Sequence, residues 1–290
     1  AEAGSRISAS GPQGGSVTIQ SETGTTLVSG IVEATGNQSP LPQGEGKGEG
    51  GVGKGGTIQI LGERVGLIGN AEINASGETG GGTVLVGGDF QGKNPDVQNA
   101  WRTYFGPDAV VKADAIRSGD GGRVIVWADD ITRYFGSLSA RGGNESGNGG
   151  FAEVSGKRLL DFNGKADLGA AHGTGGNLLL DPLNITLAAV LASPISGFTP
   201  GVDQVYDFTD DVLATSIMDV RAGGSFSGVT AGTTITLQAT NDILVIDPFD
   251  LATATGAGNV SLALQAGNNV GVNAVITASG TGSLSLTADD

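Results

Sequence analysis

The sequence predicts an all-β fold of the parallel β-helix class, a solenoid of about 11 coils with roughly 26 residues in each coil. Three observations lead to this prediction. A glycine-led phrase recurs nine times along the 290 residues, small and β-branched residues alternate within it, and a second phrase lies between its copies. A repeat of this length with an alternation of period two indicates short strands stacked on one another.

The first phrase consists of one or two glycines followed by an alternating apolar segment. Six copies are clear: GGSVTIQ (Gly14–Gln20), GGTIQIL (Gly55–Leu61), GGTVLVG (Gly81–Gly87), GGRVIVW (Gly121–Trp127), GGFAEVS (Gly149–Ser155) and GGNLLLD (Gly175–Asp181). Three are weaker: GTTITLQ (Gly232–Gln238), GNVSLAL (Gly258–Leu264) and GSLSLTA (Gly282–Ala288). The clear copies begin 41, 26, 40, 28 and 26 residues apart, and the weaker ones 26 and 24 residues apart. The 57 residues between Gly175 and Gly232 are interpreted as about two units with weak signals.

The residues within each copy distinguish a strand from a helix. Pairs such as Val17 and Ile19, or Val84 and Val86, alternate with a period of two, as in a strand that buries one face. Leucine-rich repeats have a similar unit length, but their leucine and asparagine pattern is missing here. A parallel β-helix remains, with neighbouring coils about 4.8 Å apart.

The second phrase predicts another strand in each coil. Its copies are ISASG (Ile7–Gly11), INASG (Ile73–Gly77), LSARG (Leu138–Gly142) and ITASG (Ile276–Gly280). Each places an aliphatic residue and a small residue on the inward face and ends on a turn glycine. Each coil is therefore expected to carry two or three short strands, and the 53 glycines are explained as corners.

The spacing also predicts how the chain is organised. Residues 1–187 are expected to form coils, with side loops at 37–56 and 89–104. Residues 188–231 depart from the repeat and are expected to form an irregular excursion or weak coils, and residues 232–290 continue the same solenoid. Both ends resemble cuts through a repeat, so we expect a piece of a longer rod or a unit that stacks end to end with neighbouring copies.

Composition excludes some partners. The chain has 30 acidic and 15 basic residues and a formal charge of −15, which disfavours nucleic acid and anionic membrane surfaces as partners. It contains no cysteine, no signal peptide and no run of 18 apolar residues. The acidic balance favours solubility.

The most distinctive stretch of sequence is Gly80–Leu187. It comprises GGGTVLVGGDFQGK, NAWRTYFGPDAVVKADAIRSGDGGRVIVWADD, YFGSLSARGG, GNGGFAEVSGKRLLDFNG and GTGGNLLLDPLNITL. This segment resembles the β-helical repeat region of filamentous-haemagglutinin-like exoproteins, the large passengers of two-partner secretion, especially versions common in cyanobacteria. The resemblance extends more loosely through AGTTITLQATNDILV and GNVSLALQAG to the end of the chain.

The resemblance implies a right-handed β-helix, export through a dedicated outer-membrane transporter barrel, and a surface or adhesive role. It places the protein outside the cell or on the cell surface of a Gram-negative-type bacterium. The secretion domain of that family, with its asparagine-rich motifs, has no match in this sequence.

The first side loop, NQSPLPQGEGKGEGGVGKGG, contains a near match to a phosphate-binding loop. Gly48 is followed after four residues by Gly53 and Lys54, but the next residue is Gly55 rather than Ser or Thr, and no helix pattern follows. A phosphate loop needs that hydroxyl and a helix N-terminus. The G-x-G-x-x-G match that begins at Gly46 is weak for the same reason, and no phosphate site is expected.

The second side loop supplies the candidate contact residues Trp101, Arg102 and Tyr104. Exposed aromatic rings beside an arginine can stack on a sugar ring or anchor a partner, so cell-surface glycans are candidate ligands. The favoured alternative is that Trp101 folds back over the coil as a lid on apolar surface. The phrase Tyr-Phe-Gly recurs 30 residues later and predicts an aromatic ladder, in which Phe105 and Phe135 pack rather than bind.

The runner-up function is a polysaccharide lyase or hydrolase of the β-helix class. Such enzymes need carboxylates clustered with His, Arg or Lys on adjacent coils. The available acidic groups are Asp129–Asp130, Asp210–Asp211, and Asp247 with Asp250, while the single histidine, His172, lies in a glycine-rich corner. Acidic edges such as Asp289–Asp290 suggest a solvated face rather than a calcium site. We therefore expect no enzyme, cofactor or metal, and interpret the chain as a rigid spacer that displays side loops in a large extracellular adhesin or fibre.

Overall fold

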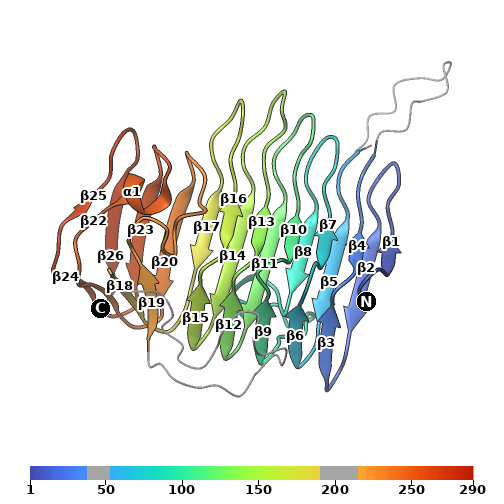
Figure 1. Ribbon diagram of the computed structural model, residues 1–290, viewed down its shortest axis with the longest axis horizontal. Helices are drawn as coiled ribbons and strands as arrows, with labels where there is room; N and C mark the ends of the chain where they lie inside the picture. Colours follow the sequence, from blue (N-terminus) through green and yellow to red (C-terminus); the bar gives the residue numbers. More distant parts are fainter. Residues whose placement is uncertain (38–52, 190–214, 290) are drawn as a thin grey trace.

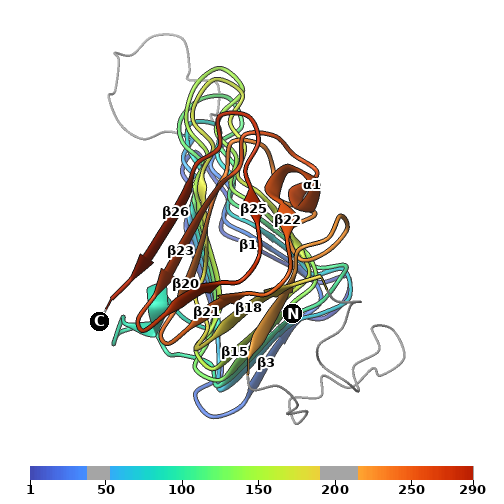
Figure 2. The same cartoon turned by 90° about the vertical axis from the view of Figure 1, so that its left-hand side faces the viewer.

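A computed structural model describes residues 1–37, 53–189 and 215–289. The chain is all-β, and long parallel sheets run along its length, the arrangement of a parallel β-helix or solenoid (Figure 1). Its two termini lie at opposite ends of the stack, and the view along the axis shows a roughly triangular cross-section (Figure 2). Within these residues, no helix is long and apolar enough to cross a membrane.

The longest sheet has nine strands, and its members are the nine copies of the first phrase. They are β2 (Ser16–Gln20), β5 (Thr57–Leu61), β8 (Thr83–Val86), β11 (Arg123–Ala128), β14 (Phe151–Gly156), β17 (Asn177–Leu180), β20 (Thr234–Ala239), β23 (Ser261–Ala266) and β26 (Leu284–Ala288). We call this the first sheet.

Two further sheets form the other sides. One has six strands: β1 (Arg6–Ser8), β4 (Ile31–Glu33), β7 (Glu72–Asn74), β10 (Val110–Lys112), β13 (Ser137–Ser139) and β16 (Lys165–Asp167). The other has five strands: β3 (Thr25–Val28), β6 (Arg64–Leu67), β9 (Arg102–Phe105), β12 (Ile131–Tyr134) and β15 (Leu159–Phe162).

The remaining elements lie toward the C-terminus, apart from a 3₁₀ turn, η1 (Phe90–Gly92). A four-stranded sheet contains β19 (Ser216–Asp219), β18 (Ile185–Ala188), β21 (Ile243–Val245) and β24 (Val270–Val272) in that spatial order. A pair is formed by β22 (Phe249–Asp250) and β25 (Ile276–Thr277), and the single helix of the described residues, α1 (Leu251–Thr255), follows β22.

The register confirms the predicted alternation. Ile58 on β5 pairs with Val84 on β8, which pairs with Val124 on β11, and all three side chains are fully buried. Equivalent positions continue through Ile235 and Leu262, so one connected hydrophobic core runs along the stack. Each coil buries its aliphatic residues against the coils above and below, as a solenoid requires.

The expected number of about 11 coils is not confirmed, since the first sheet has nine strands among the described residues. The interval from Gly175 to Gly232 does not add two units to this sheet, because β17 pairs directly with β20 and leaves no position between them. Part of the region 188–231 enters the stack out of sequence order. Strand β19 follows β18 in the chain, yet it lies between β15 and β18.

Close approach between coils explains the glycines that precede the strands. A Cβ atom on Gly82 would lie 2.1 Å from the carbonyl oxygen of Gly56 in the neighbouring coil. Any side chain at this corner would separate the two backbones, which are within pairing distance of each other.

The predicted aromatic ladder exists, but its register differs by one residue from the repeated Tyr-Phe-Gly. Phe105, Tyr134 and Phe162 are paired positions inside the core, with ring centroids 4.7 and 5.1 Å apart. Phe135 lies outside this row and packs on Tyr104 at 6.0 Å. Tyr134 tolerates complete burial because its hydroxyl donates a hydrogen bond to the Lys165 carbonyl (2.6 Å).

Candidate functional site

The structure places the three candidate contact residues at the start of a strand rather than on the side loop. Arg102 and Tyr104 belong to β9, and Trp101 directly precedes it. Trp101 is 41% exposed, and the centroid of its ring is 4.1 Å from the guanidinium carbon of Arg102 and 5.2 Å from that of Arg64. Trp101 therefore stacks on two arginines at the surface and does not cover the apolar core.

Arg102 is a structural residue. It is 5% exposed, and its Nε donates a hydrogen bond to Asp130 Oδ2 (2.7 Å), which also places the two charges in an ion pair. Asp130 accepts a further hydrogen bond from Arg158. Burial raises the pKa of Asp130, but the hydrogen bonds from Arg158 and Arg102 outweigh burial and lower that pKa below its ordinary value. Among the three candidates, Trp101 is the most exposed, whereas Arg102 is buried and Tyr104 is half-buried.

The second side loop packs back on the outer face of the first sheet. Its residue Val97 joins a small apolar cluster with Leu61, Leu85, Ile125 and Trp127, separate from the main core. These sheet residues occupy outward positions, which would face water without the loop. The tryptophan beneath the loop is therefore Trp127 and not Trp101.

Polar contacts fix both ends of this loop. Asp89 forms an ion pair with Arg123 at 2.9 Å and accepts a hydrogen bond from the Phe90 backbone at the start of η1. Asp129 accepts hydrogen bonds from Trp127 Nε1 (3.0 Å) and from Asn99 Nδ2 (3.2 Å) at the other end.

A fully buried carboxyl group lies under the loop. Glu153 on β14 accepts hydrogen bonds from the backbone N–H of Gln91, at 3.3 and 3.1 Å from its two carboxyl oxygens. Burial raises the pKa of Glu153 to about 7, and the charge of the neighbouring Asp181 acts in the same direction. Gln91 has a φ of 53°, a left-handed conformation that turns the loop down onto this carboxyl group.

The Gln91 side chain connects the loop to the next coils. Its Nε2 donates hydrogen bonds to Asp181 Oδ2 (3.2 Å) and to Gln238 Oε1 (3.1 Å), and its Oε1 accepts one from Lys93 Nζ (2.8 Å). Asp181 directly follows β17, and burial raises its pKa to about 6.

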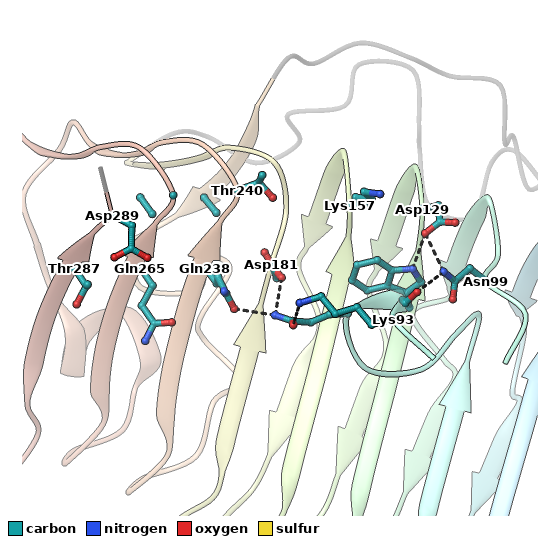
Figure 3. A pocket seen from close by; sticks show the side chains of 16 residues that line it. Lys93, Asn99, Asp129, Lys157, Asp181, Gln238, Thr240, Gln265, Thr287 and Asp289 are labelled. Carbon is teal, nitrogen blue, oxygen red and sulfur yellow. Dashed lines mark hydrogen bonds between the residues drawn. The ribbon is translucent and has the colours of Figure 1, made fainter. Parts of the chain in front are cut away.

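A polar groove of about 550 Å³ opens beside the loop, over the C-terminal part of the first sheet (Figure 3). One wall is the loop, with Lys93 and Asn99. The floor carries a row of polar side chains in register on successive coils: Asp181, Gln238, Gln265 and Thr287. Figure 3 shows these side chains one after another on neighbouring strands, so the row runs across the strands.

The acidic groups considered for catalysis do not converge. Asp129 lines the groove, whereas Asp130 holds two arginines elsewhere and Asp250 caps α1 by accepting a hydrogen bond from Thr253 N. Asp247 accepts a hydrogen bond from Ala189 N, and His172 is exposed in a turn. Asp210–Asp211 lie outside the described residues. The described part of the chain contains no group of three or more His, Cys, Asp or Glu residues arranged to hold a metal ion.

Gly46 and Gly48, where the two glycine-rich matches of the first side loop begin, lie outside the described residues. Lys54, at the end of this loop, forms a parallel bridge with Gly80 on the next coil. This end of the loop therefore continues into β structure and not into a helix.

Sequence reasoning missed Glu153, Asp181 and Gln91. A signal was present, because Glu153 lies in the strand FAEVSG, where outward neighbours on adjacent coils are the apolar Ile125 and Leu179. A row of outward apolar residues on adjacent coils, with one carboxyl group among them, indicates that another segment of the chain packs over this part of the sheet. Asp161 on β15 is also buried, and this raises its pKa to about 6 although the charge of Arg133 opposes the shift.

Comparison with family models and with curated proteins finds no match for this chain.

Proposed function

We propose that this chain is a structural segment of a large extracellular adhesin or fibre, a right-handed β-helical spacer that displays side loops. The observation that carries the proposal is the nine-stranded parallel sheet with its connected core of aliphatic residues in register. Strands inside the sheet are hydrogen-bonded on both sides, and a stack of this kind resists bending and extends in one direction.

The surface supports a spacer more than a catalyst. Of the acidic groups considered for catalysis, Asp130 and Asp250 serve as an ion-pair partner and a helix cap, and Asp129 and Asp247 have different hydrogen-bond partners. The side loop is held by hydrogen bonds to residues on and next to the first sheet. The resemblance of Gly80–Leu187 to filamentous-haemagglutinin-like exoproteins supports a proposal for how the protein is exported and where it is displayed. We propose export through an outer-membrane transporter barrel and display on the surface of a Gram-negative-type, cyanobacterial cell.

Immunogold labelling tests this location directly. Antibodies raised against the purified chain are applied to intact cells of the source organism and to permeabilised cells. The proposal expects label on intact cells. Label that appears only after permeabilisation contradicts extracellular display.

Negative-stain electron microscopy of the native protein, isolated from its source, tests the shape. The spacing of paired strands predicts that the nine-stranded sheet of this segment extends for about 40 Å along the axis, and a large fibre built from such segments should be a longer rod. Native particles no longer than this one segment would contradict a spacer.

One observation favours the runner-up function, a polysaccharide lyase or hydrolase. Glu153 and Asp181 are neighbouring carboxyl groups whose pKa values are raised to about 7 and about 6, a pattern found at catalytic sites. However, Glu153 is fully buried beneath Gln91 and out of reach of a polymer in the groove. Assays on pectate and related acidic polysaccharides, with and without calcium, distinguish the two functions. Cleavage that is lost in Asp181→Asn would establish the enzyme.

A further inference from the structure

The groove beside the second side loop has the features of a binding site that a simple spacer does not need. We propose that it binds an uncharged, extended oligosaccharide, which lies along the solenoid axis over the row Asp181, Gln238, Gln265 and Thr287. The inference deepens the proposed function, because it assigns the contact surface of the displayed segment to this groove rather than to Trp101.

The shape of the groove selects an extended ligand. Its floor residues repeat once per coil, and the row spans three intervals of about 4.8 Å, or about 14 Å in total. The volume of about 550 Å³ falls in the range of small-molecule sites and exceeds the space of a single ion or water cluster. A short linear chain with a repeating unit matches this periodic floor.

The side chains select a polyhydroxylated ligand. Gln238, Gln265 and Thr287 present amide and hydroxyl groups that both donate and accept hydrogen bonds, and Asp181 adds an acceptor. Sugar hydroxyls also donate and accept, so each coil offers a matching partner. A hydrophobic ligand would leave these polar groups unpaired at a cost in binding free energy.

The charges select against acidic polymers. Among the groove residues, the carboxyl groups of Asp129, Asp181 and Asp289 outnumber the ammonium groups of Lys93 and Lys157. The whole chain, these residues included, has a formal charge of −15. Nucleic acids and polyuronates would meet repulsion both at long range and inside the groove.

The pairing of the floor strands argues against an extended peptide that would bind by strand addition. A peptide that binds by strand addition needs a free sheet edge. Strands β17, β20 and β23 of the floor are each already paired on both sides. Among the described floor strands only β26, at the end of the row, has a free edge, and a peptide added there would extend the sheet instead of lying over the row. The ligand must therefore be recognised by side chains alone.

The loop wall is preorganised. Gln91 is held by Glu153 from below and by Asp181 and Gln238 from the side, so the wall does not need to be ordered when a ligand enters. Preorganisation reduces the entropic cost of binding.

Titration calorimetry with defined hexasaccharides tests the proposal. The neutral probes are β-1,4-linked glucose, mannose and xylose and α-1,4-linked glucose, and the acidic probes are hexagalacturonate and a heparin hexasaccharide. We expect at least one neutral probe to bind, and Gln265→Ala and Thr287→Ala each to weaken that binding about tenfold by removing hydrogen bonds to the sugar.

The matched control is Gln59→Ala. Gln59 lies on β5, on the outer face of the same sheet, but does not line the groove. Its removal should leave the affinity unchanged. Thermal unfolding of all three variants verifies that they are folded, and because Gln265 and Thr287 are exposed, their unfolding midpoints should match that of the wild type.

Three results would overturn the inference: no binding of any neutral probe, equal weakening by Gln59→Ala, or preferential binding of an acidic probe. None of them bears on the particle shape that electron microscopy would measure or on immunogold label at the cell surface. Failure of this inference is therefore distinguishable from failure of the spacer proposal.

Discussion

Glu153 shows how a single buried residue links the surface loop to the stability of the protein. In the folded state its pKa is about 7, above the ordinary value of 4.5, because burial disfavours the charged form. The stabilisation that depends on the neutral form is complete below pH 4.5 and is lost as the pH rises toward and through 7. By pH 8 the difference corresponds to about 3 kcal/mol.

Glu153→Gln removes this titration while retaining a side-chain oxygen that can accept the hydrogen bond from Gln91. We expect the variant to unfold at a higher temperature than the wild type at pH 8, and at a similar temperature at pH 4.5. Thermal melts followed by circular dichroism across this range measure the effect. The control is Glu145→Gln, at an exposed turn position, which should follow the wild type. A wild-type curve with the same pH dependence as Glu153→Gln would show that the Glu153 carboxyl group is solvated.

Gly82 tests the close approach of neighbouring coils. A methyl group at this position would meet the Gly56 carbonyl oxygen at 2.1 Å, so Gly82→Ala must push two backbones apart. We expect a loss of about 1–3 kcal/mol or more in the free energy of unfolding, measured by denaturant titration. Gly258→Ala is the matched control, because a Cβ atom on Gly258 would meet no other atom within 4 Å. Equal stability of the two variants would mean that the corner is looser than the structure shows.

The side loop is the element that sets this solenoid apart from a plain spacer. It docks through Val97 on outward apolar residues, including Leu85 and Ile125, that form a cluster separate from the main core. Because the two clusters are separate, we expect that the loop can detach without unfolding the stack.

Val97→Asp introduces a charge into this small cluster and should detach the loop. We expect trypsin to cleave after Lys93 about tenfold faster or more, while the main thermal transition changes little. Mass spectrometry of the digest identifies the site of cleavage. Asp96→Ala, at the neighbouring exposed position, should be cleaved at the wild-type rate. A lower main transition in Val97→Asp would show that the loop is part of the global folding unit.

At the level of elements, the sequence predicted the strands of the first sheet better than it predicted the segments that pack against or between the strands. The glycine-led phrases correspond to all nine strands of the first sheet, because the pattern of buried side chains repeats with the coil. Strand β19 could not be predicted, since its position between β15 and β18 depends on contacts between segments far apart in the chain. Which tryptophan the second side loop covers, Trp127 or Trp101, depends on where the loop packs on the sheet. No local sequence pattern predicts that position.

At each end of the described stack, the inward residues of the last coil have no neighbour beyond them among the described residues. Leu286 on β26 is 45% exposed, whereas its register partner Leu264 on the preceding coil is fully buried. At the other end, Ile7 on β1 is 38% exposed and pairs with the buried Val32. The two ends present opposite faces of the same coil geometry, so a second copy stacked head to tail would cover both.

Sedimentation velocity over a range of protein concentrations tests this stacking. We expect the wild type to associate into longer species, and Leu286→Asp to remain monomeric because a charge at the stacking face would be buried without a partner. Ile116→Asp is the matched control: Ile116 is also 45% exposed but lies on the side of the rod, so this variant should associate like the wild type. If the wild type is monomeric at every concentration, copies of this chain do not stack. If Ile116→Asp also blocks association, the contact is lateral, and the exposed leucines of the last coil are not the surface that joins one rod to the next.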